Sequence, residues 1–385
     1  MAPYALAADE SCRKVKIGSM DITAHESLTW KYILNQLISG QDLGSRHVDW
    51  AMDEIMTGST PEPILASFLT SLHMKGETSE ELGALARGML AKAETIDLDV
   101  HAVDIVGTGG DQQNTVNIST MAALVIAGTG ATVVKHGNRA STSKSGSADV
   151  LEALGIQLDM PIKSVAACAR QVGITFLFAM TFHPSMRFVG PTRKMLGIPT
   201  AFNYLGPMTN PARVSSSAIG VANPQMVEKM AWVFANRGDH ALIFRGDDGL
   251  DELTIATTSQ IWEASGGTLQ KYVFNPEGYG IERSSLDNLR GGDAEYNASV
   301  FRAVLAGEGE SAKDSLHAIR NAVLINAAAG LIAYRKNDGR SFEERYTEAL
   351  ADARQSIDTG AAAQVLNAWV EFSHCLLYTS DAADE

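Results

Sequence analysis

Hydrophobic residues recur at intervals of three and four through the first quarter of the chain, a spacing typical of amphipathic helices. Thr78 and Glu81 have the spacing of a capping box, which predicts that a helix begins beside them. An earlier helix, which begins after Pro61, places Phe68 on its apolar face. We therefore expect helices up to about Ile96, with the periodic apolar residues in a core.

From Asp97 onward, short β-branched runs alternate with helical segments. Residues 103–106 predict a strand, residues 121–127 an apolar helix, and residues 132–134 a second strand. A strand–helix–strand unit makes its two strands parallel neighbours. Further strands are expected at 174–178 and 240–244, and helices at 223–236, 319–334 and 361–372. After Glu252 we expect the chain to return to helices, and the pattern as a whole predicts an α/β fold.

Two glycine-rich loops follow the first two predicted strands. Residues 107–111 read GTGGD, and residues 135–139 read KHGNR. Because parallel strands end at the same edge of a sheet, both loops should emerge where open α/β folds bind ligands. Glycines let the backbone approach phosphate oxygens, and a helix start near Ser119 would offer free N–H groups to an anion. The two loops therefore predict a phosphate-binding site.

The spacing of these glycines excludes two common phosphate motifs. No lysine stands in the P-loop position, and Gln112 occupies the place of the third glycine of a dinucleotide fingerprint. A lone glycine cluster of this kind is as often a tight turn. The second loop favours the phosphate site, because it is basic and continues through several serines and threonines into a helix predicted at 148–154.

An acidic segment follows the strand predicted at 240–244. Asp247, Asp248, Asp251 and Glu252 place four carboxylates within six residues, and close pairs of such charges repel by roughly 1 kcal/mol in water. Such a cluster is either splayed into solvent or neutralised by a hard cation such as Mg²⁺. Its position at the end of a strand, as for the glycine loops, favours Mg²⁺. Together the three segments indicate electrostatic catalysis on a phosphorylated substrate.

Composition narrows the partners of this site. The formal net charge of −14 argues against nucleic acid and acidic membranes. Anionic substrates must then be attracted locally, by Lys135, Arg139, Arg193 and helix starts. Three scattered cysteines are too few for a disulfide framework, which fits a reducing cytoplasm. We expect no membrane span, because no apolar run approaches the roughly 20 residues that a span needs.

Several blocks of the sequence together resemble the anthranilate phosphoribosyltransferase family. They read GTGGD at 107–111, NIST at 117–120, KHGNR at 135–139, GSAD at 146–149, FN at 202–203, LGP at 205–207, TNP at 209–211 and GLDE at 249–252. The blocks occur in the family's order and spacing, and the resemblance covers roughly Ser27 to His374. Arg245, Tyr204 and Met186 depart from the residues that are frequent in the family, which are His, Leu and an aromatic residue respectively.

The resemblance implies a role for each group of residues. Phosphoribosyl pyrophosphate would be bound by Gly107, Gly110, Asp111, Thr115, Asn117, Ile118, Ser119, Thr120, Lys135, Gly137, Asn138, Ser143 and Ser147. Anthranilate would be bound by Gly107, Asn138, His136, His183 and Arg193. A guanidinium such as that of Arg193 suits its carboxylate. Two Mg²⁺ ions would be held by Ser119, Asp251 and Glu252.

The resemblance also implies the fold, the reaction and the assembly. A small helical domain, residues 20–97 joined by helices within about 160–197, would face an α/β domain, residues 98–374, that has a mostly parallel central sheet. The active site would lie in the cleft between them. There the amine of anthranilate would attack C1 of the ribose as pyrophosphate leaves, in a step of tryptophan biosynthesis that needs no strong nucleophile or base. The family further implies a cytoplasmic homodimer that associates through the helical domain.

Two other functions remain open for this fold. A pyrimidine-nucleoside phosphorylase also binds an anionic pentose, but its lysine- and serine-bearing signatures are not found here. A non-catalytic nucleic-acid-binding relative should have a basic surface and a degraded acidic motif, whereas this chain is acidic and retains Asp251 and Glu252.

The two ends of the chain lack the pattern of the rest. Residues 1–19 have no apolar periodicity, and we interpret them as a disordered extension or the product of an upstream start codon. Residues 375–385 resemble a translated sequencing adapter, and we interpret them as a non-native tail.

Overall fold

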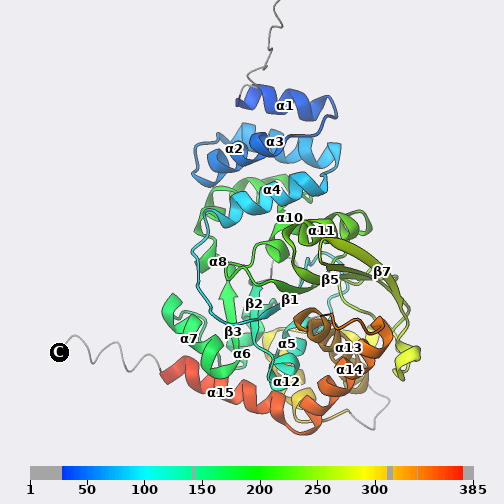
Figure 1. Ribbon diagram of the computed structural model, residues 1–385. Coiled ribbons are helices and arrows are strands. Elements are labelled where there is room, and N and C mark those ends of the chain that lie inside the picture. The colour runs from blue at the N-terminus through cyan, green and yellow to red at the C-terminus, as the bar shows by residue number, and fades with distance from the viewer. Residues whose placement is uncertain (1–27, 141–143, 310–314, 336, 376–385) are drawn as a thin grey trace, which may run out of the picture.

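The computed structural model describes residues 28–140, 144–309, 315–335 and 337–375, so the predicted extension at 1–19 and the tail after Cys375 lie outside it. Four helices stack at one end of the molecule (Figure 1). They are α1 (Trp30–Ile38), α2 (Ser45–Met56), α3 (Glu62–Lys75) and α4 (Ser79–Leu90). The capping box expected at Thr78 and Glu81 is present, because each side chain accepts a hydrogen bond from the backbone N–H of the other.

A seven-stranded sheet forms the centre of the molecule, with the strand order β3-β2-β1-β4-β5-β6-β7. The strands are β1 (Val103–Gly107), β2 (Val133–Gly137), β3 (Ile174–Phe178), β4 (Ser216–Gly220), β5 (His240–Gly246), β6 (Ser259–Ser265) and β7 (Thr268–Phe274). The first five are parallel, and β1 pairs with β2 as the strand–helix–strand pattern predicted. The expected class, a helical domain with a mostly parallel α/β domain, is confirmed.

The prediction that helices follow Glu252 is wrong. The chain forms two antiparallel strands, β6 and β7, before it returns to helices. The alternation of β6 is hidden because an inward position holds a charged residue, Glu263, which is 2% exposed. Ser265 and Thr268 pair across the tight turn at Gly266 and Gly267, which is the local signal that marks a hairpin.

Helices cover both faces of the sheet. On one face α5 (Ile118–Gly128) and α13 (Ser315–Tyr334) pack on each other and on the strands, while α11 (Pro224–Arg237) packs on β5 and β6 from the other and contacts α4 of the bundle. By length and composition alone α13 could cross a membrane. However, 89% of its apolar stretch is buried inside the protein, as expected for a core helix.

The remaining helices complete the two layers. They are α6 (Ser147–Ala153), α7 (Ile162–Val172), α8 (Ala179–Phe182), α9 (Gly190–Leu196), α10 (Phe202–Leu205), α12 (Ala294–Leu305), α14 (Phe342–Asp358) and α15 (Ala361–Cys375), with short 3₁₀ turns η1 (Pro184–Phe188), η2 (Gly206–Met208), η3 (Pro276–Tyr279) and η4 (Leu286–Leu289). The segments η1 and α9 pack against α2 and α3 of the bundle. Consequently Arg193, on α9, is attached to the helical end of the molecule rather than to the sheet.

Candidate active site

The first glycine loop leaves β1 at Gly107 and reaches α5 through a series of left-handed residues. Gly109 and Gly110 have φ of 71° and 85°, and Gln112 and Asn114 have φ of 60° and 52°. Left-handed residues within a turn bring successive backbone N–H groups to one side and form a concave anion site. Non-glycine residues in this conformation are strained, and such strain gathers at functional sites.

Asp251 lies directly against this loop. Its Oδ2 accepts a hydrogen bond of 2.6 Å from the backbone N–H of Gly109. A Cβ at Gly107 would collide with its carboxylate, and a Cβ at Gly220 would collide with its carbonyl. The two glycines at the ends of neighbouring strands β1 and β4 therefore make the space that Asp251 occupies.

Three carboxyl groups converge at this point. Burial, and then the charge of Asp111, raise the pKa of Asp251 to about 7. Burial and the charge of Asp251 raise the pKa of Glu252 well above its ordinary value, although Lys135 acts in the opposite direction. Glu252 is 7% exposed, and its Oε2 has no hydrogen-bond partner. The site therefore holds more negative charge than its neighbours neutralise, which is the property of a cation site.

The structure divides the acidic segment into two pairs. Asp247 accepts hydrogen bonds from Thr258 and Gln260, and Asp248 accepts one of 2.6 Å from Thr254. These carboxylates are therefore satisfied by side chains between Thr254 and Gln260. Of the four carboxylates noted in the sequence, only Asp251 and Glu252 are directed at the glycine loop.

Lys135 is buried below the loops rather than exposed to solvent. Its ammonium donates to the Ile105 carbonyl and lies 3.4 Å from Ser119 Oγ. Asp104, the neighbouring carboxylate, accepts from the backbone N–H of His136 at 3.1 Å and from Asn210 at 2.9 Å. Burial raises the pKa of Asp104 to about 6, although Lys135 and these donors oppose the shift.

The second glycine loop is joined to the first by side chains. Thr120 Oγ1 donates to Ser147 Oγ at 3.1 Å, and Asn117 Nδ2 donates to the Ser145 carbonyl at 3.0 Å. Ser143 lies outside the described residues. The expectation that Arg139 attracts substrate is not supported, because its guanidinium is paired with Asp149 and Glu152 of α6.

His136 and His183 form a buried pair, with ring centroids 5.1 Å apart. Burial lowers the pKa of His136 to about 3 and that of His183 to about 4, so both rings are neutral. Each ring forms a hydrogen bond of 3.0 Å to a backbone carbonyl. His136 Nδ1 binds the Gly206 carbonyl, and His183 Nε2 binds the Thr209 carbonyl. Because a carbonyl only accepts, the ring nitrogen that faces it must carry the proton. The other nitrogens, His136 Nε2 and His183 Nδ1, therefore have lone pairs, and both are buried without a hydrogen-bond partner among the described residues.

Arg193 has no recorded carboxylate partner among the described residues. Its Nη2 donates to Asn203 Oδ1 at 3.2 Å, and its guanidinium lies 5.9 Å from the centre of the Phe202 ring. Burial lowers the pKa of Arg193, which nevertheless stays charged at neutral pH. A half-buried guanidinium that lacks an anion is suited to a substrate carboxylate.

Comparison with known proteins agrees with this geometry. Residues 31–93 match the helical bundle domain of a glycosyl transferase family, and residues 99–363 match its a/b domain. Anthranilate phosphoribosyltransferases from an Arthrobacter species and from Rhodococcus opacus are 53% and 51% identical to the chain, over 89% and 90% of its length and 95% and 93% of theirs. The chain belongs to the anthranilate phosphoribosyltransferase family.

Solved structures of other members have the same fold. The enzyme from Thermus thermophilus matches 89% of this chain and 99% of its own, with 36% identity and a TM-score of 0.81. The enzyme from Saccharomyces cerevisiae, solved in complex with PRPP and Mg, matches 91% of this chain and 99% of its own, with 28% identity and a TM-score of 0.81. The predicted family and its activity, phosphoribosyl transfer in tryptophan biosynthesis, are thereby confirmed.

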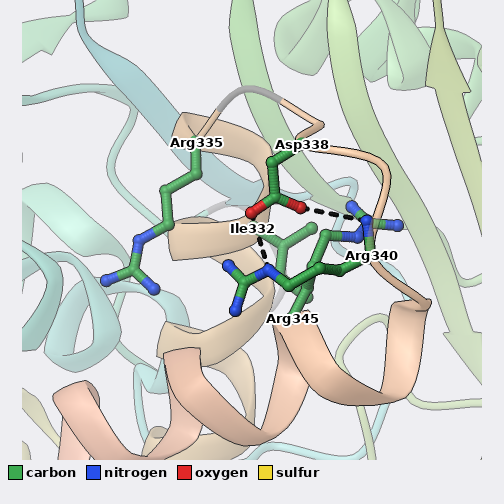
Figure 2. Close-up of a pocket in the computed structure, with 5 residues that line it drawn as sticks. All are labelled: Ile332, Arg335, Asp338, Arg340 and Arg345. Carbon is green, nitrogen blue, oxygen red and sulfur yellow. Dashed lines mark hydrogen bonds and ion pairs between the residues drawn. The ribbon is translucent and has the colours of Figure 1, made fainter.

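A cavity outside the candidate site is lined by several arginines whose charges are compensated. This cavity of about 70 Å³ is lined by Ile332, Arg335, Asp338, Arg340 and Arg345, and Figure 2 shows how these residues lie. Arg335 pairs with Asp352, Arg340 with Asp338, and Arg345 with Glu263. Because each arginine already has a carboxylate, the cavity offers no uncompensated positive charge to an anion.

Sequence reasoning assigned no role to several residues that support the anthranilate phosphoribosyltransferase site, although Asn203 and Asn210 stand in blocks that resemble the family. Asp104 accepts the backbone N–H of His136, Asn210 donates to Asp104, and Asn203 accepts a hydrogen bond from Arg193. Asn297 bonds Asn117 at 2.9 Å across 180 positions of sequence. A weak signal existed for each, since a polar residue within an apolar run is costly to bury unless it has a partner.

Proposed function

We propose that the carboxyl edge of the sheet binds phosphoribosyl pyrophosphate between the two glycine loops and transfers its phosphoribosyl group to the amine of anthranilate. The observation that carries this proposal is the pair Asp251 and Glu252, which is buried, uncompensated and in contact with a backbone anion loop. Ligand contacts are assigned to the residues named from the family resemblance. Those proposed for phosphoribosyl pyrophosphate lie at the ends of β1 and β2, in the loops that follow these strands and at the starts of α5 and α6, apart from Ser143.

Ser119, Asp251 and Glu252 are proposed to hold two Mg²⁺ ions. They fit the ion, because the ligands are oxygens and Glu252 Oε2 has a free, buried lone pair. Among the described residues no three His, Cys, Asp or Glu side chains form a metal site by themselves. The remaining ligands would then come from pyrophosphate and water. When bound, Mg²⁺ supplies positive charge that stabilises pyrophosphate as a leaving group.

Anthranilate is proposed to lie between the α9 segment and the second glycine loop. Arg193 would bind its carboxylate, and Gly107 and Asn138 would line the approach to the ribose. His136 Nε2 and His183 Nδ1 are the lone pairs available to amine hydrogens. Because both imidazoles are neutral, they can accept hydrogen bonds without repelling the positive charge that develops on the amine.

The chain contributes to the reaction mainly by position. The amine attacks C1 of the ribose while the bond from C1 to pyrophosphate breaks, and the amine then loses one proton. An aromatic amine is already nucleophilic, so no residue has to deprotonate it first. The backbone N–H groups of residues 107–111 and the buried Lys135 would fix the two reactants, and such alignment lowers the barrier.

The decisive assay follows the loss of anthranilate fluorescence in the presence of phosphoribosyl pyrophosphate and Mg²⁺. We expect turnover that stops in excess chelator and resumes when Mg²⁺ is restored. Turnover that persists in chelator would refute the metal assignment. Consumption of phosphoribosyl pyrophosphate without loss of anthranilate would refute the acceptor.

We further propose a cytoplasmic homodimer that associates through the helical bundle. Ile38 at the end of α1 and Met74 near the end of α3 are 73% and 79% exposed, and their apolar surface supports an interface there. Replacing both residues by lysine should give a monomer in light scattering combined with size exclusion. A wild-type chain that is monomeric at micromolar concentration would refute the proposal.

A further inference from the structure

The segment that connects η4 to α12 lies against the entrance to α5. The Val116 N–H donates to the Leu289 carbonyl at 2.9 Å, and the Gly291 N–H donates to the Asn114 carbonyl at 2.8 Å. Thr115 and Arg290 form an antiparallel bridge between these two bonds. A Cβ at Gly291 would meet the Thr115 carbonyl, so the two backbones touch. Residues 289–292 therefore form a backing strip behind the first phosphate loop.

Asn297 extends this strip into the site. It lies in the first turn of α12 and is 2% exposed. Its Oδ1 accepts the Gly292 N–H at 2.9 Å, and its Nδ2 donates to Asn117 Oδ1 at 2.9 Å. Asn117 Nδ2 then donates to the Ser145 carbonyl at 3.0 Å. A single directed chain of hydrogen bonds thus runs from the backing strip, through two amides, to the second phosphate loop.

The direction of this series of hydrogen bonds fixes the orientation of the side-chain amides of Asn297 and Asn117. Each amide accepts on its oxygen and donates from its nitrogen, so a flip of either would oppose donor to donor or acceptor to acceptor. One donor and one acceptor of the Asn117 amide are consequently used by protein groups. Although Asn117 is the N-cap of α5, its side chain makes no capping hydrogen bond. It acts instead as a tie between the two loops.

We propose that Asn297 is a positioning residue for phosphoribosyl pyrophosphate, because it orients Asn117 and thereby sets the spacing of the two phosphate loops. This inference rests on the proposed function, which places that substrate between the loops. Asn297 does not touch the substrate in this scheme. A buried amide in a helix is otherwise unfavourable, since both helix propensity and desolvation disfavour it.

The test replaces Asn297 by Asp, which has the same size. The new carboxylate still accepts the Gly292 N–H but cannot donate to Asn117, so Asn117 must turn and abandon the Ser145 carbonyl. We expect the KM and the calorimetric Kd for phosphoribosyl pyrophosphate with Mg²⁺ to rise by roughly 5- to 100-fold, the range for loss of one partner in a buried pair. The KM for anthranilate should change by less than about 3-fold, since none of the altered hydrogen bonds involves Arg193, His136 or His183.

Asn321→Asp is the matched control. Asn321 is also a buried helical amide, 6% exposed, and its recorded partner is His317 one turn away on α13. We expect it to lower the melting temperature without changing the Kd for phosphoribosyl pyrophosphate. If Asn297→Asp does not fold, Asn297→Ala, which adds no charge, carries the same expectation.

The outcomes separate the two proposals. Equal Kd values for wild type, Asn297→Asp and Asn321→Asp would overturn the positioning role and leave Asn297 as a packing residue. Parallel losses for both substrates would also overturn it, because a general defect would then explain the variant. Failure of wild type to bind phosphoribosyl pyrophosphate with Mg²⁺ would refute the proposed function itself.

Discussion

Buried carboxylates occur on neighbouring strands in two opposite settings. Asp251 and Glu252 follow β5 and have raised pKa values, because burial and mutual repulsion outweigh the single cation nearby, Lys135. Glu263, on β6, is equally buried, but two hydrogen bonds of 2.7 and 2.8 Å from Arg345 and one of 3.0 Å from His240 outweigh burial and lower its pKa to about 2. The difference teaches that compensation, rather than burial, separates a structural carboxylate from a functional one.

The largest effect is expected when the negative charge of the uncompensated pair, Asp251 and Glu252, is removed. Asp251→Asn combined with Glu252→Gln should lower kcat/KM by about 10³-fold or more, because metal-ion charge stabilisation is worth several kcal/mol. Stability should be unchanged or higher, since repulsion is relieved. Fluorescence kinetics and thermal melting measure the two effects. Asp247→Asn, in the same turn but bonded to Thr258, is the control and should retain activity.

The converse test breaks the compensated pair. Arg345→Met leaves Glu263 buried with His240 as its remaining side-chain partner, and should lower the free energy of unfolding by about 3–5 kcal/mol. Activity per folded molecule should stay near wild type. Urea denaturation measures the loss, and Arg345→Met with Glu263→Leu should recover most of it. Unchanged stability in Arg345→Met would show that the pair contributes little.

A smaller effect is expected at Arg193, a cation without a carboxylate partner in the described part of the chain that is proposed to bind the carboxylate of anthranilate. Arg193→Ala should raise the KM for anthranilate by roughly 10- to 150-fold, the value of a charge-assisted hydrogen bond of about 1.5–3 kcal/mol. Binding of phosphoribosyl pyrophosphate should stay within a few-fold of wild type. Calorimetric titration of each substrate distinguishes these results, with the exposed Lys194→Ala on the same helix as control. Equal losses for both substrates would contradict the assignment.

The smallest effect is the pH dependence of stability. A folded pKa of about 7 for Asp251 exceeds its ordinary value of 3.8, so between these values the folded state binds more protons than the unfolded state. Stability should therefore fall by about 1 kcal/mol as pH rises from about 6 to 8. Asp251→Asn should reduce this slope in urea titrations, and the part that remains comes from Glu252 and Asp104, whose pKa values are also raised. Glu263 has the opposite sign, and its contribution is lost as pH falls from about 4.5 towards 2.

Elements specified by local pattern could be predicted from the sequence. The strands β1 and β2 and the helix α5 follow from β-branched runs, an apolar helix and glycine loops, all within a short stretch. The strand β4 gave no such signal, because Ser216–Gly220 contains a single β-branched residue, Ile219, and its other residues are small. In β6, the inward Glu263 reads as a surface residue until Arg345, 82 positions away, is known to be its partner.

The candidate site divides in the same way. Its loops and their order could be predicted, because glycines and carboxylates at strand ends report on local chemistry. The partners of its side chains could not. That Arg139 is neutralised by Glu152, that Asp111 lies beside Asp251, and that Asn117 is held by Asn297 depend on which elements pack together. Tertiary contacts decide whether a charged residue is free to meet a ligand.

The two glycines that contact Asp251 limit which substitutions this enzyme can tolerate. Any side chain at Gly220, even a methyl group, would collide with the Asp251 carbonyl, and one at Gly107 would collide with its carboxylate. We therefore expect a mutational search for new acceptor amines to find its tolerated changes around Arg193 on α9 and Met186 on η1, the segments that pack against the helical bundle. On the proposed assignment, the preference for the acceptor amine can be varied while the residues that bind the sugar phosphate are left unchanged. A library can therefore randomise the acceptor side alone.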